Sequence, residues 1–199
     1  MRGFTSHVLA SSLHLHTNTE QISSQHYGFQ NMIVDEQGYR LNVGIILVND
    51  AGRVFVGRRI GHDTWQFPQG GVGEGESPEE AMTRELDEEI GLMAEDIEIL
   101  GCTKHWLRYR LPKQYIRHNQ KPLVIGQKQK WFLLKLISSE QKIRLDVSES
   151  PEFDSWRWTD YSQPSKDVIY FKQQVYRQAL KELKPLLKET IEQQEMSLP

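Results

Sequence analysis

The sequence lacks several features that would place it in other protein classes. Its 199 residues include a single cysteine, Cys102, which excludes a disulfide framework and a zinc site built from several thiolates. No run of about 18 apolar residues occurs, so the sequence predicts neither a membrane-spanning helix nor a membrane partner. With 38% hydrophobic residues, 26% charged residues and a net charge of −3, the composition is typical of a globular protein in a reducing compartment. We therefore expect a cytoplasmic protein.

Charged residues are scarce or one-sided in three segments. Residues 1–31 hold only two charged side chains among Ser, Thr, Gln and Asn, and they predict a disordered N-terminal extension. Residues 74–98 hold eleven acids and one base, whereas residues 99–139 hold nine bases and no acid. These blocks are either two solvated faces of opposite charge, or a cation-collecting site beside a surface that binds a polyanion.

The alternation of apolar residues predicts a sheet. An apolar run at 43–48, a turn at 49–52 and a second run at 54–56 predict a β-hairpin. Further strands are expected at 65–68, 97–104, 106–111, 128–137 and 153–158. Together with two helices, this order predicts an α/β protein with a mixed sheet flanked by helices. The domain is expected to cover residues 32–185, followed by a C-terminal tail at 186–199.

Two helices are expected from their end signals and periodicity. Ser77 and Glu80 form a capping-box pattern around Pro78, and Gly91 supplies a left-handed C-terminal residue, which predicts a helix over 78–90. A second helix is expected to start near Ser165 and to end at Pro185. Its apolar stripe comprises Val168, Phe171, Val175, Ala179 and Leu183.

A candidate site lies on the first helix and in the loop before it. Glu85, Glu88 and Glu89 are spaced by three and four residues, so their carboxylates project from one helix face. Four glycines within 70–75 allow close approach of the backbone to a ligand, but their spacing fits neither a P-loop nor a dinucleotide fingerprint. Taken alone, the carboxylates could be a solvated stripe. With the loop and the basic block, they indicate a divalent cation and attack on a phosphate chain.

One motif resembles the signature of the Nudix hydrolase superfamily. It reads Gly70, five residues, Glu76, seven residues, Arg84-Glu85-Leu86, one residue, Glu88-Glu89, one residue, Gly91-Leu92. The resemblance implies a Nudix-type α/β/α sandwich with a mixed β-sheet. It also implies hydrolysis of a diphosphate linked to another group, with water as the nucleophile and divalent metal ions.

Longer stretches closely resemble the bacterial RNA pyrophosphohydrolases within this superfamily. They are residues 65–71, 104–113, 125–132 and 151–158, and the similarity extends from about Met32 to Leu183. The implied substrate is a single-stranded RNA 5′ end rather than DNA. Its 5′-triphosphate or diphosphate would be hydrolysed to a 5′-monophosphate with release of pyrophosphate or phosphate, which initiates mRNA decay. The same stretches resemble dinucleoside polyphosphate hydrolases more loosely, and asymmetric hydrolysis of such dinucleotides is the alternative.

The resemblance also implies roles for individual residues. Glu85, Glu88 and Glu89 would be catalytic metal ligands for Mg2+, with Mn2+ possible, and the carbonyl of Gly70 would complete the shell. Glu152, within Pro-Glu-Phe-Asp, matches a further carboxylate of the family, and its neighbour Glu149 is the rival. Arg84 is expected to tie the loop to the helix.

Basic and aromatic residues supply candidates for substrate contacts. Those for phosphate are Arg40, Arg59, Lys128 and Lys130. Phe171 and Lys172 could stack on and hydrogen-bond a base, with Arg59 on its opposite side, as aromatic and arginine planes do for single-stranded RNA. Phe171 also lies on the apolar helix stripe, so it is alternatively a core residue.

Overall fold

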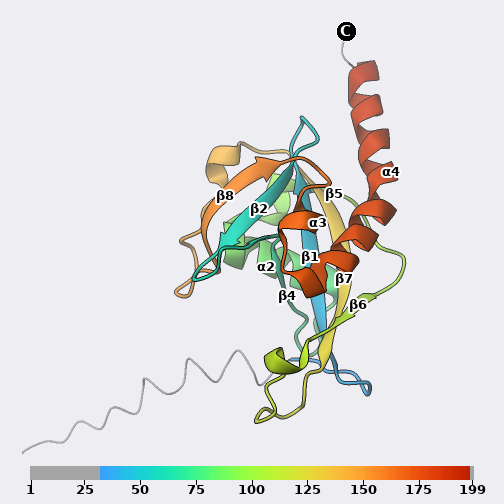
Figure 1. Cartoon of the computed structure of the whole chain (residues 1–199). Coiled ribbons are helices and arrows are strands. Elements are labelled where there is room, and N and C mark those ends of the chain that lie inside the picture. Colours follow the sequence, from blue (N-terminus) through green and yellow to red (C-terminus); the bar gives the residue numbers. More distant parts are fainter. Residues whose placement is uncertain (1–31, 198–199) are drawn as a thin grey trace, which may run out of the picture. The chain divides into compact units, whose positions relative to one another are not determined.

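The computed structural model describes residues 32–197 (Figure 1). The prediction for residues 1–31 lies outside these residues. The strands are β1 (Tyr39–Val48), β2 (Val54–Arg59), β3 (Trp65–Gln66), β4 (Gln69–Gly71), β5 (Ile97–Cys102), β6 (Leu107–Arg110), β7 (Gly126–Leu136) and β8 (Phe153–Thr159). The α-helices are α2 (Pro78–Ile90), α3 (Pro164–Asp167) and α4 (Gln173–Ser197). Short 3-10 helices are η1 (Ala94–Asp96), η2 (Lys113–Tyr115), η3 (Glu140–Lys142) and η4 (Tyr170–Lys172).

All eight strands belong to one mixed sheet. Its main path runs β3-β2-β1-β7-β5, while β4 pairs with β1, β6 with β7 and β8 with β2. The pair β1 and β7 is parallel along its whole length, from Tyr39 opposite Gly126 to Val48 opposite Lys135. The other strand pairs are antiparallel, which includes the predicted hairpin of β1 and β2. The predicted mixed sheet is confirmed.

Helices cover both faces of the sheet (Figure 1). On one face, Met82, Leu86 and Ile90 of α2 pack with inward residues of β1 and β7. On the other face, the apolar residues of α4 pack around Trp131 and Phe67. Strand β1 is buried on both sides because each face carries a helical layer. This arrangement is the expected α/β/α sandwich.

Helix α2 has the predicted ends. The Ser77 side chain accepts a hydrogen bond from the Glu80 backbone N–H, and the Glu80 side chain accepts one from Ser77 N–H. Gly91 closes the helix with φ of 69°, a left-handed conformation that favours glycine. The two caps fix the start and the end of the helix, and with them the direction in which its glutamates point.

The prediction for the second helix is wrong in two respects. The chain forms α3, η4 and α4 instead of one helix from Ser165, because Val168 takes an extended conformation with ψ of 154°. In addition, Pro185 lies inside α4, which continues to Ser197. Leu187, assigned to the tail by the sequence, is buried against the α4 face of the core. Burial of this side chain offsets the backbone hydrogen bond that proline cannot donate. No helix within residues 32–197 is long and apolar enough to cross a membrane.

Candidate active site

The acidic face of α2 meets the glycine loop that follows β4. Glu85 and Glu89 are buried, with 8% and 9% of their surface exposed, whereas Glu88 is exposed. The Gln69 backbone N–H donates to Glu89 Oε2 at 3.0 Å. The Glu85 carboxylate lies directly against Gly70, in the space that a Cβ atom would need. A glycine at position 70 is therefore required by the close approach of backbone and carboxylate.

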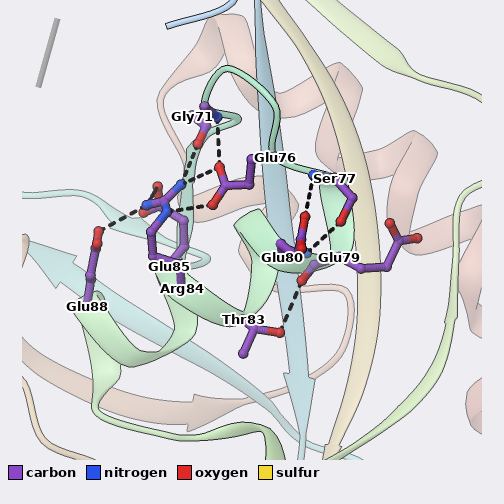
Figure 2. A network of polar contacts seen from close by, with 10 residues as sticks. Gly71, Glu76, Ser77, Glu79, Glu80, Thr83, Arg84, Glu85 and Glu88 are labelled. Atoms are coloured by element: carbon purple, nitrogen blue, oxygen red, sulfur yellow. Dashed lines mark hydrogen bonds and ion pairs between the residues drawn. The ribbon is translucent and has the colours of Figure 1, made fainter. Parts of the chain in front are cut away.

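Arg84 joins the loop to α2, as the family resemblance implies (Figure 2). Its Nε donates to Glu76 Oε1 at 2.8 Å, and its Nη2 donates to the Gly71 carbonyl at 2.7 Å. Its Nη1 donates to Glu85 at 2.7 Å and to Glu88 at 3.1 Å. The guanidinium thus fixes the loop and compensates the charge of neighbouring carboxylates.

Burial shifts the titration of these carboxylates. Desolvation raises the pKa of Glu85, although the hydrogen bond from Arg84 opposes this shift. Desolvation also raises the pKa of Glu89 well above its ordinary value, and the charges of Glu85 and Glu152 raise it further. A divalent cation would relieve both the burial of charge and the repulsion, and carboxylate oxygens are the ligands that hard cations prefer. The donor set therefore fits such an ion.

The carboxylates do not form a ready cluster of metal ligands. Among residues 32–192, whose side chains the structure describes, no three His, Cys, Asp or Glu side chains are grouped closely enough to hold a metal ion. Glu88 accepts a hydrogen bond from Arg84. Glu152 forms an ion pair with Arg59 Nε at 3.3 Å and accepts a hydrogen bond from Gln66 Nε2, also at 3.3 Å. Arg84 and Arg59 thus supply positive charge beside the carboxylates of Glu88 and Glu152, respectively.

Glu152 reaches this region from the start of β8. Its charge acts on Glu89 and on Lys172, which is buried with 8% of its surface exposed. Burial and the nearby Arg59 lower the pKa of Lys172 to about 8. The rival Glu149 is exposed and is not among the charges that act on Glu89. The arrangement favours Glu152 as the fourth acidic residue.

The structure separates the predicted phosphate contacts into two groups. Arg40 lies close to Gly71 and to the Glu85 charge, and its buried Nε has no hydrogen-bond partner. Arg59 lies beside Glu152. By contrast, Lys128 is paired with Asp35 at 2.9 Å, and Lys130 donates to the backbone carbonyl of Thr103. The tertiary structure therefore brings the two arginines to the carboxylates and holds the two lysines elsewhere.

Phe171 contacts other aromatic rings at the edge of the core. Its ring centroid lies 5.8 Å from that of Tyr109, 5.1 Å from Tyr115 and 5.4 Å from Tyr170. The side chain is partly buried and packs against the α4 face of the core. No ring contact joins it to Arg59 among the described residues. Phe171 therefore combines a packing role with a partly open ring.

A buried polar group was not predicted from the sequence. Gln129 Nε2 donates to Asn42 at 2.7 Å and to Gln69 at 3.0 Å, while its buried Oε1 has no partner. Gln66 similarly supports Glu152. The available signal was the alternation along β7, which places Gln129 on the same side of the strand as the apolar Trp131 and Leu133. A polar side chain at a buried position requires hydrogen-bond partners.

A glycine loop that leads into an acid-faced helix, on one face of a mixed sheet, is typical of hydrolases of phosphate chains that use divalent metal ions. The chain belongs to the Nudix family: the NUDIX domain matches residues 38–181. The RNA pyrophosphohydrolase of Legionella pneumophila (strain Corby) is 69% identical over 157 residues, which cover 79% of this chain and 90% of that protein. The RNA pyrophosphohydrolase of Pseudomonas fluorescens (strain SBW25) is 59% identical over 155 residues, covering 78% and 98%.

Solved structures agree with this fold. The E. coli dihydroneopterin triphosphate pyrophosphohydrolase aligns with a TM-score of 0.56 and 24% identity, covering 69% of this chain and 92% of that one. A C. elegans Ap4A hydrolase in a binary complex aligns with a TM-score of 0.55 and 21% identity, covering 75% and 98%. At these identities the likeness concerns the fold alone.

Proposed function

We propose that this protein hydrolyses the 5′-triphosphate or diphosphate end of RNA to a 5′-monophosphate, and so initiates mRNA decay in the cytoplasm. The observation that carries the proposal is the meeting of Glu85, Glu89 and Glu152 with the cations Arg40 and Arg59. This arrangement combines acidic residues for a metal with basic residues for phosphate. The two relatives with 69% and 59% identity are RNA pyrophosphohydrolases, which supports RNA as the substrate.

The acidic residues would hold Mg2+ or Mn2+. The candidates are Glu85, Glu88, Glu89 and Glu152, together with the carbonyl of Gly70. When bound, such ions neutralise phosphate oxygens and lower the pKa of a coordinated water. Release of Glu88 from Arg84 and of Glu152 from Arg59 would make these carboxylates available.

The remaining side chains would position the substrate. Arg40 offers a buried, unpartnered Nε–H beside the glycine loop, and a phosphate oxygen would satisfy it. Arg59 and Lys172 lie on the Glu152 side and could contact the first nucleotides. Arg84 remains with the protein, because Glu76 and the Gly71 carbonyl occupy its other donors.

The decisive experiment compares two substrates at equal concentration. We expect faster turnover of a 5′-triphosphorylated RNA than of diadenosine tetraphosphate, measured as released pyrophosphate or phosphate and as nucleotide products. A chelator should abolish turnover, and Mg2+ or Mn2+ should restore it. Faster cleavage of the dinucleotide would instead support the alternative, a dinucleoside polyphosphate hydrolase.

A further inference from the structure

A hollow lies beside Phe171, on the side of β6 and the start of α4. It has a volume of about 510 Å³ and is lined by Tyr39, Arg108, Tyr109, Arg110, Phe171 and Gln174. This volume is within the usual range for small-molecule sites and would accommodate a nucleobase with its sugar. None of the carboxylates of the candidate active site lines it, so it is a separate feature of the surface.

Two exposed tyrosines extend the aromatic lining of the hollow. Tyr115 in η2 is 43% exposed and Tyr170 in η4 is 60% exposed, and both rings contact Phe171. Tyr170 is therefore mostly exposed to solvent and is not a core residue. Exposed aromatic rings that touch one another provide flat faces on which successive unstacked bases can stack.

The charge beside these rings is positive. Arg108 and Arg110 are exposed, and neither is paired with a carboxylate among residues 32–192, whose side chains the structure describes. Arg108 donates to the neutral Gln37 side chain at 3.2 Å and lies 5.6 Å from the centre of the Tyr39 ring. Both arginines belong to the acid-free segment 99–139. A polyanion would therefore be attracted to this surface and meet no opposing acid from its own segment.

We propose that this surface, consisting of Tyr115, Tyr170, Phe171, Arg108 and Arg110, binds nucleotides of single-stranded RNA downstream of the 5′ end. The tyrosines stack on bases and the arginines contact the backbone. The inference rests on the proposed function, since it extends the same substrate away from the carboxylates. Phe171 directly precedes Lys172, whose charge acts on Glu89 and Glu152, so the chain links this separate surface to the candidate active site.

Binding of a reaction product tests the surface without requiring catalysis. The probe is a 5′-monophosphorylated octanucleotide RNA with a 3′ fluorophore, titrated with the full-length protein and followed by anisotropy. Tyr170→Ala and Tyr115→Ala should each weaken binding about tenfold, in line with the loss of one stacked base. Tyr170→Phe should retain near-normal affinity, because stacking needs the ring and not the hydroxyl. Ile137→Ala is the matched control, since Ile137 is 57% exposed and lies just beyond β7.

A length series gives a second readout. For triphosphorylated RNAs of two, four and eight nucleotides, kcat/KM should rise with length in the unaltered protein, and Tyr170→Ala should flatten that rise. Unchanged binding and an unchanged length dependence in both alanine variants would overturn the inference and leave the surface available for a protein partner. Circular dichroism and thermal melting of each variant separate loss of contact from loss of fold, and weak binding by a folded Tyr170→Phe protein would also contradict stacking.

The two proposals fail in different ways. If the protein cleaves triphosphorylated RNA but the tyrosine variants bind the octanucleotide normally, the downstream surface is wrong and the proposed function stands. If the protein binds the octanucleotide through the tyrosines but does not cleave the triphosphate, the proposed function is wrong and the surface stands.

Discussion

Among the acidic residues of the site, Glu89 has the surroundings that least favour a charged carboxylate. Its carboxylate is buried, it accepts a hydrogen bond from Gln69, and two neighbouring carboxylates repel its charge. Such a group is costly in a protein without a positive partner, which is the physical reason to expect a cation beside it. The burial of the Glu89 carboxylate is therefore better explained by a role in the site than by a contribution to the stability of the fold.

Glu89→Gln should lower turnover of triphosphorylated RNA by about 10²-fold or more while the protein remains folded. The amide keeps the size of the side chain and removes the charged ligand. Initial rates at saturating Mg2+ measure the loss, and circular dichroism checks the fold. Glu79→Gln, on an exposed position of the same helix, is the control. Near-normal turnover of a folded Glu89→Gln protein would contradict the assigned site.

Asp96 illustrates a charged residue that acts on stability instead. It accepts hydrogen bonds from the Met93 backbone at 3.0 Å and from Lys142 Nζ at 2.6 Å. The hydrogen bond from Lys142 is the main cause that holds the pKa of Asp96 below its ordinary value. Because the folded state favours the ionised form, this contribution is present at neutral pH and is lost as the pH falls below about 4, through the folded-state pKa.

Asp96→Ala should lower the free energy of unfolding by about 1–2 kcal/mol at pH 7. Urea denaturation at a series of pH values should show the difference from the unaltered protein shrinking in acid. Asp146→Ala is the matched control, since its ion pair with Arg144 is exposed on both sides and should contribute little. A difference that stayed constant down to pH 2 would mean that the ionised carboxylate is not the stabilising form.

At the scale of elements, the loop and α2 act as one unit. Arg84 bonds the Gly71 carbonyl and Glu76 on the loop and two glutamates on the helix, so the loop cannot shift without breaking several hydrogen bonds. The capping box and Gly91 hold the helix ends. This rigid connection holds the Glu85 carboxylate of α2 against Gly70. Supporting contacts of this kind fix the position of a functional side chain.

Helix α4 continues beyond Pro185, where the sequence predicts the C-terminal tail, and the packing of this part of the helix can be tested. Leu187 lies beyond Pro185 and is 7% exposed, packed on the same face as Leu183. Leu187→Ala should therefore lower the free energy of unfolding by about 2–3 kcal/mol, measured by urea denaturation. Lys188→Ala, at an exposed neighbouring position, should change it little. If the two variants were equally stable, residues after Pro185 would not pack on the domain.

At the scale of the whole molecule, acidic and basic regions occupy different parts of the fold. The acids of 74–98 lie on and around α2, while the acid-free segment 99–139 runs through β6 and β7. Lys128 and Lys130 are engaged by the protein itself, whereas Arg108 and Arg110 are left exposed. The free positive charge of this segment is therefore smaller than its composition suggests.

The affinity for a triphosphorylated octanucleotide should fall steeply with salt. Three phosphate contacts would give a slope of log K against log salt near −2, at about −0.7 for each neutralised phosphate. Changing Arg108 and Arg110 together to alanine should reduce the slope by about 1.4. It should weaken binding of RNA more than binding of diadenosine tetraphosphate, whose phosphates are expected to lie mainly at the carboxylates. Binding measured at four salt concentrations tests this, and an unaltered slope would show that these arginines are simply solvated.

The features that the sequence predicted correctly depend on neighbours within a few residues. The hairpin of β1 and β2 and the caps of α2 follow from local periodicity and turn chemistry. Of the three glutamates expected on one helix face, Glu85 and Glu89 are buried and Glu88 is exposed. The family motif lies within one loop and one helix, so it could also be recognised from the sequence alone. These are short-range effects, which act before distant parts of the chain meet.

Other features were decided only by tertiary contacts. Glu152, just before β8 and more than sixty residues along the chain, acts on Glu89, and Lys128 is held by Asp35. Phe171 contacts Tyr109 and Tyr115, which lie more than fifty residues before it in the sequence. The helix break at Val168 and the continuation through Pro185 reflect packing that outweighs local preference. Local sequence thus determined the motif and its helix, while the packing of distant segments decided which charges and rings surround it.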